Sequence, residues 1–319
     1  MITAVKPTAL LDRQRGATRA YRLQHDEPLA EGIQRVAAAR ADSAIEHLRG
    51  KVDEPFAEAI HEARKDLKKL RSVVRFVREP LGEYFYRRDN DRFREAGRLL
   101  SGTRDAEVKL ETLAALRERF GDRFPESGLV PFADALQGER RALSGEDSRN
   151  GSGSSAEIAA RQLEEARDAI AEWPLDGDGF EPIEEGLKRG YRRGRNRFAD
   201  TVDDPTEENV HEWRKRVKDL WYHLRLVRDA RPKALGKAAD RAHDLSDLLG
   251  DHHDLAVLRD DAVRRGDALE TEDLGRLQEL VEQRQRELLD AATGLAEKTY
   301  AKKPKAFTAR IGEYWADWR

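Results

Sequence analysis

Two stretches of the chain carry the same set of basic side chains at the same spacing. The set in the first stretch consists of His61, Arg64, Lys65, Lys68, Arg75 and Arg78. The set in the second stretch consists of His211, Arg214, Lys215, Lys218, Arg225 and Arg228. On a helix, which turns by about 100° per residue, most of each set forms a cationic stripe opposite an apolar face. The constant offset of 150 between matched positions, such as 61 and 211, indicates an internal duplication of a cationic helix.

The cations within each stripe repel one another. His61, Lys65 and Lys68 follow one another on successive turns, and the second stretch repeats this spacing. Like charges at such spacings destabilise a helix by about 0.2–0.5 kcal/mol per pair, whereas a merely solvated helix face interleaves acids with its bases. Because both copies contain this repulsion between like charges, we expect an anionic partner that relieves it on binding. A basic segment at 186–198 adds Arg189 and Arg193, and the matching region of the first copy adds Arg35.

The two matched histidines fit the same interpretation. His61 and His211 lie near the amino ends of their expected helices, where the helix dipole favours anions. An imidazole can also donate a hydrogen bond to a phosphate oxygen. We therefore expect both histidines to contact an anion.

A further group, Asp251-His252-His253-Asp254, contains residue types that bind metals. The matching place in the first copy reads Gly102-Thr103-Arg104-Asp105, so only the aspartate recurs. A helix-capping aspartate explains both copies, and we expect no metal ligand and no catalytic residue here. The alternative is a metal-dependent phosphohydrolase of the HD type, or a metal-chelating protein, that uses His252, His253, Asp254 and His211.

The composition limits the possible partners. Of 319 residues, 38% are charged, yet the net charge is only −3, so attraction for a polyanion must come from segregated charge. The absence of cysteine excludes disulfides, thiolate catalysis and cysteine-based zinc sites. No apolar run approaches the ~20 residues of a membrane helix, and the first residues lack the apolar core of a signal peptide, so a cytoplasmic protein without a membrane partner is expected. Nucleic acid is not the expected polyanion, since stacking aromatics, Trp221 and Tyr222, occur in one copy only.

The positions of proline and glycine along the chain predict an all-α fold. Proline opens and glycine closes several amphipathic segments, and no stretch alternates as a strand would. We expect a loose lead-in at 1–27, a first helical bundle at 28–173 with a Gly/Ser loop at 144–155, and a second bundle at 179–319. In the second bundle, a helix at about 233–249 should end at Gly250 and be followed by another to about 265.

Four segments together resemble the CHAD family, the conserved histidine α-helical domain. They are AIHEARKDLKKLRSVVRFVR at 59–78, LSGTRDAEVKLETL at 100–113, VHEWRKRVKDLWYHLRLVR at 210–228 and LSDLLGDHHDLAVLR at 245–259. The resemblance implies two antiparallel bundles related by a pseudo-two-fold axis, with both stripes facing a basic central cavity. It also implies binding of inorganic polyphosphate by the matched basic residues, without catalysis or a cofactor, and association with polyphosphate granules and their proteins. Since no triphosphate-tunnel domain is recognised, a stand-alone binder is expected.

Overall fold

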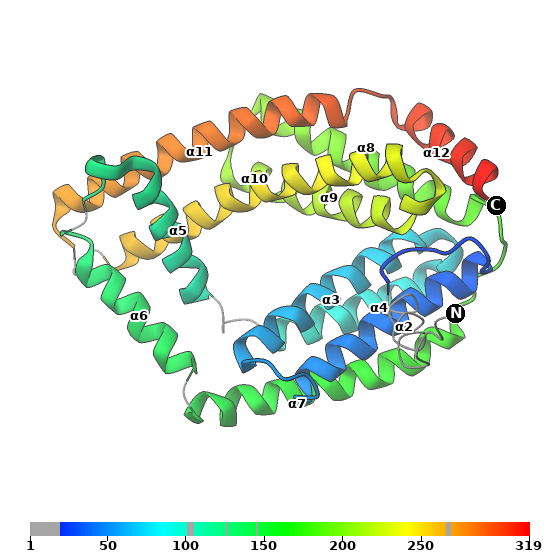
Figure 1. Ribbon diagram of the computed structural model, residues 1–319, viewed down its shortest axis with the longest axis horizontal. Helices are drawn as coiled ribbons and strands as arrows, with labels where there is room; N and C mark the ends of the chain where they lie inside the picture. The colour runs from blue at the N-terminus through cyan, green and yellow to red at the C-terminus, as the bar shows by residue number, and fades with distance from the viewer. Residues whose placement is uncertain (1–19, 101–104, 126, 145, 266–268) are drawn as a thin grey trace, which may run out of the picture.

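The computed structural model describes residues 20–100, 105–125, 127–144, 146–265 and 269–319, and these residues form helices without any strand (Figure 1). The predicted all-α class is therefore confirmed. Within this part of the chain, no helix combines the length and the apolar character that crossing a membrane requires.

Four helices from the first half of the chain form one antiparallel bundle. They are α2 (Leu29–Leu48), α3 (Phe56–Phe76), α4 (Arg78–Leu99) and α7 (Glu146–Ala169), which the 3-10 turn η2 (Ile170–Glu172) follows. Helix α2 packs against α3 and α7, and α4 packs against the same two helices from the other side. Pro28 and Pro55 precede α2 and α3, because proline suits the start of a helix but not its interior. Helix α4 kinks at Gly82, whose φ of 77° strongly favours glycine.

The second half supplies α8 (Glu181–Asp203), α9 (Glu207–Leu226), α10 (Pro232–Arg264), α11 (Thr271–Thr299) and α12 (Pro304–Trp318), with the 3-10 turn η3 (Arg228–Ala230) after α9. Helix α9 packs between α8 and α10, α11 packs on α10, and α12 packs on α8. The two stripe helices correspond closely, since α3 ends at Phe76 and α9 ends at Leu226, 150 positions later.

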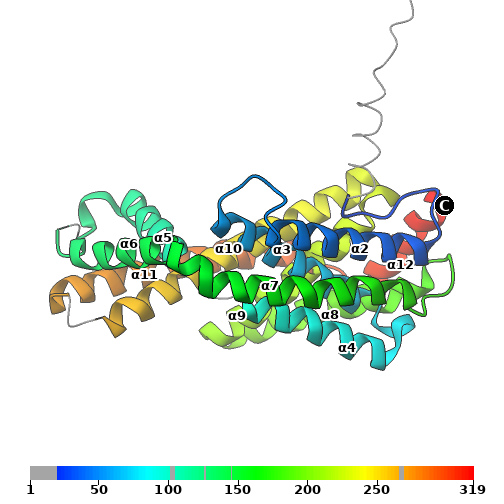
Figure 2. The same ribbon diagram turned by 90° about the horizontal axis from the view of Figure 1, so that it is seen from below.

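Helices α5 (Asp105–Phe120) and α6 (Val130–Ser144) leave the first bundle, with the turn η1 (Gly121–Arg123) between them. They lie against the far ends of α10 and α11, beyond the rest of the molecule (Figures 1 and 2). There they form a second apolar cluster that includes Leu116 and Phe132 from the first copy and Leu258 and Leu277 from the second. The first apolar cluster draws on both copies as well. The division between the two cores therefore does not follow the repeat.

Two expectations about connections were wrong. The described residues of the expected Gly/Ser loop at 144–155 are helical, since α6 ends at Ser144 and α7 begins at Glu146. Each glycine costs a helix only about 1 kcal/mol, and the following turns bury Ala159 and Leu163 in the core of the first bundle, which favours extension of the helix. The helix end that we expected at Gly250 does not occur either.

Gly250 lies inside the continuous helix α10. A Cβ atom at this position would lie 3.6 Å from Nε of Arg214, an ordinary van der Waals contact, so the glycine faces a stripe side chain without being required by it. Most of the lead-in, residues 1–19, falls outside the described residues. The remainder is packed: Tyr21 and Leu23 are buried, and the Leu23 amide donates to the Leu226 carbonyl oxygen at 2.9 Å.

The two copies approach each other most closely along α8. A Cβ atom on Gly186 would lie 1.7 Å from the carbonyl oxygen of Phe76, at the end of α3. A Cβ atom on Gly190 would lie 2.9 Å from Nδ1 of His223, whose ring packs on Phe76. His223 is buried, and its Nε2 atom lies 3.2 Å from the Ser72 carbonyl oxygen. Burial lowers the pKa of His223 to about 4, so this ring is neutral at pH 7.

Candidate functional site

The carboxyl-terminal halves of the two stripe helices are joined by an ion pair. Arg75 of α3 donates from Nε and Nη2 to Oδ1 of Asp219 on α9, at 3.1 and 2.8 Å. Arg216 donates to Oδ2 of the same carboxylate at 3.3 Å. Asp219 is 8% exposed, and only 20% of the Arg75 side chain is accessible. One buried carboxylate therefore holds an arginine from each copy.

Further arginines surround this ion pair. We define the arginine cluster as Arg71, Arg75, Arg78, Arg189, Arg193 and Arg216 around Asp219. Arg189 donates to the Arg75 carbonyl oxygen at 2.5 Å and pairs with Glu79. Burial, together with the neighbouring Arg78 and Arg193, lowers the pKa of Arg189 to about 10.

The same effects act elsewhere in the cluster. Burial lowers the pKa of Arg193, and Arg216 adds to the effect; burial and Arg75 lower the pKa of Arg71. Such depressed values mean that each cation is destabilised by desolvation and by its neighbours. The arginine cluster thus retains an electrostatic penalty that Asp219 does not cancel, and an incoming anion would relieve it.

A second group of basic residues lies along the amino-terminal halves of the stripes. Burial lowers the pKa of Lys218, and Arg214 and Lys65 lower it further, whereas Asp247 and Asp254 act in the opposite direction. Lys65 acts on Lys218 from the other stripe, and the two stripe helices, α3 and α9, are in contact. In the same group, Arg214 Nε is buried and makes no hydrogen bond to the described residues.

His211 in this group lies against His253 of α10. The ring centroids are 4.5 Å apart, and the Nδ1 atom of His211 is buried without a hydrogen-bond partner among the described residues. Burial lowers the pKa of His211 to about 4, with His253 contributing, and burial also lowers the pKa of His253. At pH 7 both rings are therefore neutral, and His211 can act as a hydrogen-bond donor but not as a cation.

Acidic side chains lie closer to the basic side chains of the stripes than the sequence suggested. Lys65 donates to Glu62 and Lys215 donates to Glu212, each at 2.5 Å, so both copies keep one local ion pair. In addition, Asp254 comes from α10 rather than from the stripe helix. Periodicity along one helix cannot reveal an acid that a neighbouring helix contributes. The repulsion that we expected within each stripe is therefore partly offset by these acids.

The remaining predicted contacts are held in different ways. The Arg225 guanidinium lies 5.3 Å from the ring centroids of Tyr21 and Trp221. Arg35 is bound by Glu27, to which its Nε and Nη2 atoms donate at 2.7 and 2.6 Å. Thus Arg35 already has an intramolecular anion. Other predicted residues are at least partly accessible to solvent. The accessible ones on or just after the stripe helices are Lys68, Lys215 and Arg228, and the partly accessible ones are His61, Arg64 and Lys218.

Sequence reasoning missed Asp219 and Arg216 as parts of the site. A signal was present, because the matching positions of the first copy are Lys69 and Asp66, with the charges exchanged. In the first copy, Lys69 donates to Asp66 at 2.7 Å within α3. In the second copy, the acid is at the later position, where it reaches Arg75 across the interface. A comparison of the two copies for reversed charges would have indicated this contact.

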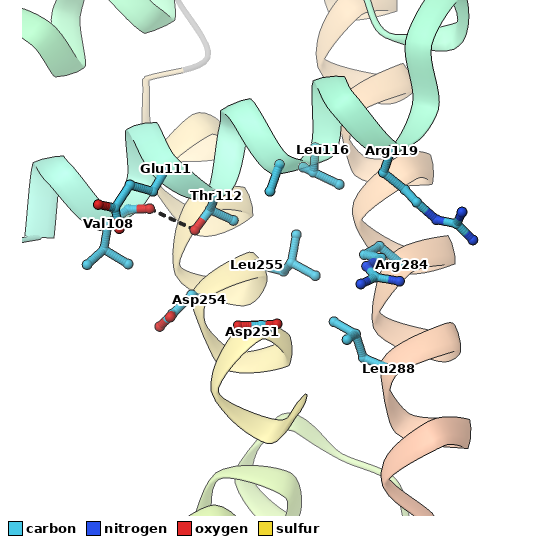
Figure 3. A pocket seen from close by; sticks show the side chains of 11 residues that line it. Val108, Glu111, Thr112, Leu116, Arg119, Asp251, Asp254, Leu255, Arg284 and Leu288 are labelled. Atoms are coloured by element: carbon cyan, nitrogen blue, oxygen red, sulfur yellow. Dashed lines mark hydrogen bonds between the residues drawn. The ribbon is translucent and has the colours of Figure 1, made fainter. Parts of the chain in front are cut away.

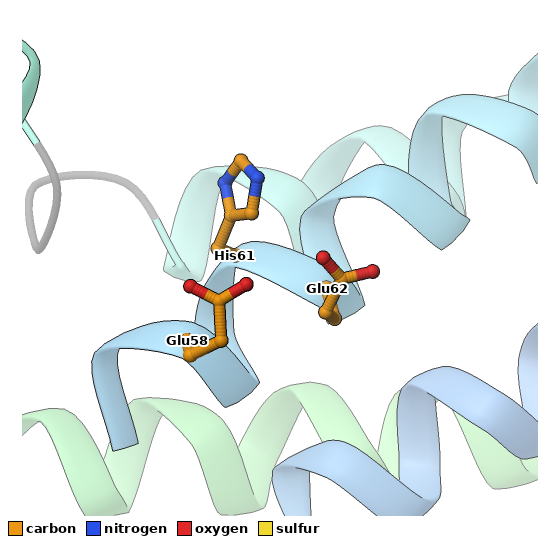
Figure 4. A group of neighbouring side chains, drawn as sticks. All are labelled: Glu58, His61 and Glu62. Carbon is orange, nitrogen blue, oxygen red and sulfur yellow. The ribbon is translucent and has the colours of Figure 1, made fainter. Parts of the chain in front are cut away.

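One group among the described residues has three metal-ligating atoms within 4.8 Å of one another: Glu58, His61 and Glu62 on α3 (Figure 4). The Lys65 ammonium group already bonds to Oε1 of Glu62 and would compete with a cation there. His252, by contrast, is 6% exposed, and its pKa is lowered by burial. The alternative ligand set of His252, His253, Asp254 and His211 does not converge in this way among the described residues.

A cavity of about 260 Å³ lies beside the second stripe, between α5, α10 and α11 (Figure 3). Asp251, Asp254 and Arg284 line it together with Leu116 and Leu288. Burial raises the pKa of Asp251, and Asp254 contributes to the rise. Asp254 also acts on Lys218, so these carboxylates provide local countercharge beside the second stripe.

The match to a known family covers most of this architecture. The family model described as the CHAD domain matches residues 35–263, which include both stripe helices. No curated protein matches the chain.

Proposed function

Since the chain belongs to the CHAD family, we propose that it binds inorganic polyphosphate along its two cationic stripes and does not catalyse a reaction on it. The observation that carries this proposal is the arginine cluster, in which cations from both copies are partly buried around Asp219, while Glu79 and Glu83 pair with Arg189 and Arg78 at its edge. Each phosphate unit of the polymer offers charged oxygens, and arginine and lysine bind them without requiring a base sequence.

Different residues have different roles in the proposed complex. Asp219 orients Arg75 and Arg216, so part of the cationic surface is organised before the ligand arrives. Lys68 and Lys215 are exposed and could meet the polymer first. The neutral His211 would donate a hydrogen bond to a phosphate oxygen. A single polymer that passes from the amino-terminal group to the arginine cluster would contact both copies. A cytoplasmic location near polyphosphate granules stays a prediction.

Binding of polyphosphate should weaken strongly with salt, because the polymer releases counterions when the protein neutralises its charges. By analogy with single-stranded nucleic acid, several contacts would give a slope of log affinity against log salt of about −3 or steeper between about 50 and 200 mM. Calorimetry at graded salt concentrations measures this slope. A slope near zero would rule out the proposed mode of binding.

A matched pair of variants on α8 makes this test specific. Arg189→Gln with Arg193→Gln should flatten the slope, since both residues belong to the arginine cluster. Lys188→Gln with Arg195→Gln changes the net charge equally on another face of α8 and should leave the slope nearly unchanged. Competition with DNA and RNA of equal charge should favour polyphosphate.

Binding should not require a metal, because the Asp-His-His-Asp group lacks a second copy and its ligand atoms do not converge. Treatment with a chelator should leave the affinity for polyphosphate unchanged, and His252→Ala should change it by less than about threefold. Calorimetry and metal analysis of the purified protein check both statements. Stoichiometric zinc or manganese that is lost together with binding, or release of phosphate from the polymer, would favour the metal-dependent phosphohydrolase instead.

A further inference from the structure

A second pocket lies behind the stripe of α9. Leu220 projects from the face of α9 opposite His211 and Lys218, about 160–180° around the helix from them, and Leu224 lies about 120–140° from them. They line a pocket of about 200 Å³ between α8, α9, α10, α12 and the connection from α11 to α12. Its wall is apolar and includes Leu220, Leu224, Leu235, Ile311, Tyr191 and Phe307.

The aromatic part of this wall is held in place. The rings of Tyr191 and Phe307 stack with centroids 3.9 Å apart and an angle of 15°. The hydroxyl of Tyr191 donates to the carbonyl oxygens of Thr299 and Lys302, at 3.2 and 3.0 Å. Because the wall is fixed before any ligand arrives, little conformational entropy would be lost on binding.

The rim of the pocket is cationic. The charged residues that line it are Arg241, Lys298, Lys302 and Arg310, and no acid lines it among the described residues. Arg310 donates from Nε to the Tyr314 hydroxyl at 2.9 Å, and Arg241 donates to the Lys298 carbonyl oxygen at 3.2 Å.

Of the four basic side chains at the mouth of the pocket, the two arginines are fixed and the two lysines are not. The Arg310 and Arg241 guanidiniums are held by the hydrogen bonds just described, and Glu313 is an acid that acts on Arg310 from outside the pocket. The ammonium groups of Lys298 and Lys302 belong to exposed side chains, so they can close on an anionic group.

We propose that this pocket binds a small amphiphilic anion, with one aromatic ring or short alkyl chain against the apolar wall and a carboxylate or phosphate at the cationic rim. The size is suitable, since a cavity of about 150 Å³ accommodates benzene and this one measures about 200 Å³. Polyphosphate has no apolar part and would leave the wall unused. The site therefore lies outside the proposed polyphosphate function and does not depend on it.

Calorimetry with three probes on the full chain tests the proposal. Phenyl phosphate combines ring and anion, benzyl alcohol lacks the anion, and inorganic phosphate lacks the ring. We expect phenyl phosphate to bind at least about tenfold more tightly than either of the others, since each part adds on the order of 1.4 kcal/mol or more. Equal binding of phenyl phosphate and inorganic phosphate, or no binding of phenyl phosphate, would overturn the proposal.

Variants distinguish this pocket from the stripes, which could also attract a phosphate. Lys298→Gln with Lys302→Gln should lower the affinity for phenyl phosphate about tenfold and leave that for benzyl alcohol unchanged. Ala238→Phe should fill the pocket and abolish the binding of both phenyl phosphate and benzyl alcohol. If this variant does not fold, the double lysine variant alone tests the proposal. Arg189→Gln with Arg193→Gln should have no effect on phenyl phosphate. Loss of phenyl phosphate binding in this last variant, but not in the lysine variant, would assign the ligand to the stripes.

Discussion

Reversing the charges of Arg214 and Lys218 together should lower the affinity for long polyphosphate by at least about a hundredfold. Each charge-assisted hydrogen bond contributes about 1.5–3 kcal/mol, so the loss of two corresponds to two orders of magnitude or more. Reversing Arg64 and Lys68 in the first copy should have a comparable effect. We expect one polymer to reach both stripes, because the Arg75–Asp219 ion pair joins the two stripe helices, and the second stripe then acts at high effective concentration.

Calorimetry with long and short chains measures this effect. Short polymers that reach only one stripe should bind weakly even to the unmodified protein. As a control, Arg161→Glu with Arg286→Glu changes the net charge equally at side chains that are 63% and 69% exposed, on α7 and α11, and should have little effect. If either stripe variant keeps full affinity for long chains at half the stoichiometry, the stripes are two separate sites.

Asp261→Asn should lower the free energy of unfolding by about 3–5 kcal/mol. Oδ2 of Asp261 accepts a hydrogen bond from Lys109 of α5 at 3.0 Å, and the two side chains are only 4% and 7% exposed. Without this carboxylate, the buried Lys109 ammonium would retain only Glu139, at 3.9 Å, among the acids that the structure places near it. Removal of one partner from a buried pair leaves an uncompensated charge, which accounts for the large effect.

Urea denaturation followed by circular dichroism measures this loss. Asp260→Asn is the matched control, because the neighbouring Asp260 is 59% exposed where it pairs with Arg259 and should matter by less than about 1 kcal/mol. The double change Lys109→Met with Asp261→Leu removes both charges and should recover much of the stability. Equal stability of the two single variants would show that the buried pair does not hold α5 against α10.

The sequence predicted the helices and the stripes well, because both depend on local spacing. Pro55 and Pro205 lie just before the starts of α3 and α9, as the pattern of the sequence predicts. Local spacing failed where packing between distant helices decides the structure. Gly250 resembles a helix end, but it lies inside the continuous helix α10, where it faces Arg214. The Gly/Ser tract resembles a loop, but the buried turns that follow support a helix.

The same distinction applies to the residues of the candidate site. The basic residues were found because they repeat at one offset, whereas Asp219 was missed because its partner Arg75 is 144 positions away. The position of α5 and α6 against the second copy was not predicted either. It depends on apolar contacts between side chains such as Leu116 and Leu258, which no periodic pattern within one helix can reveal.

The close contact along α8 means that the two copies are not interchangeable parts. The positions that match Gly186 and Gly190 in the first copy are Val36 and Arg40. Gly186 leaves no room for a Cβ atom beside the Phe76 carbonyl oxygen, and Gly190 leaves none beside His223. A tandem of two identical first copies would place a valine and an arginine against these groups, and it could not close in the same way. The first half therefore cannot take the place of the second.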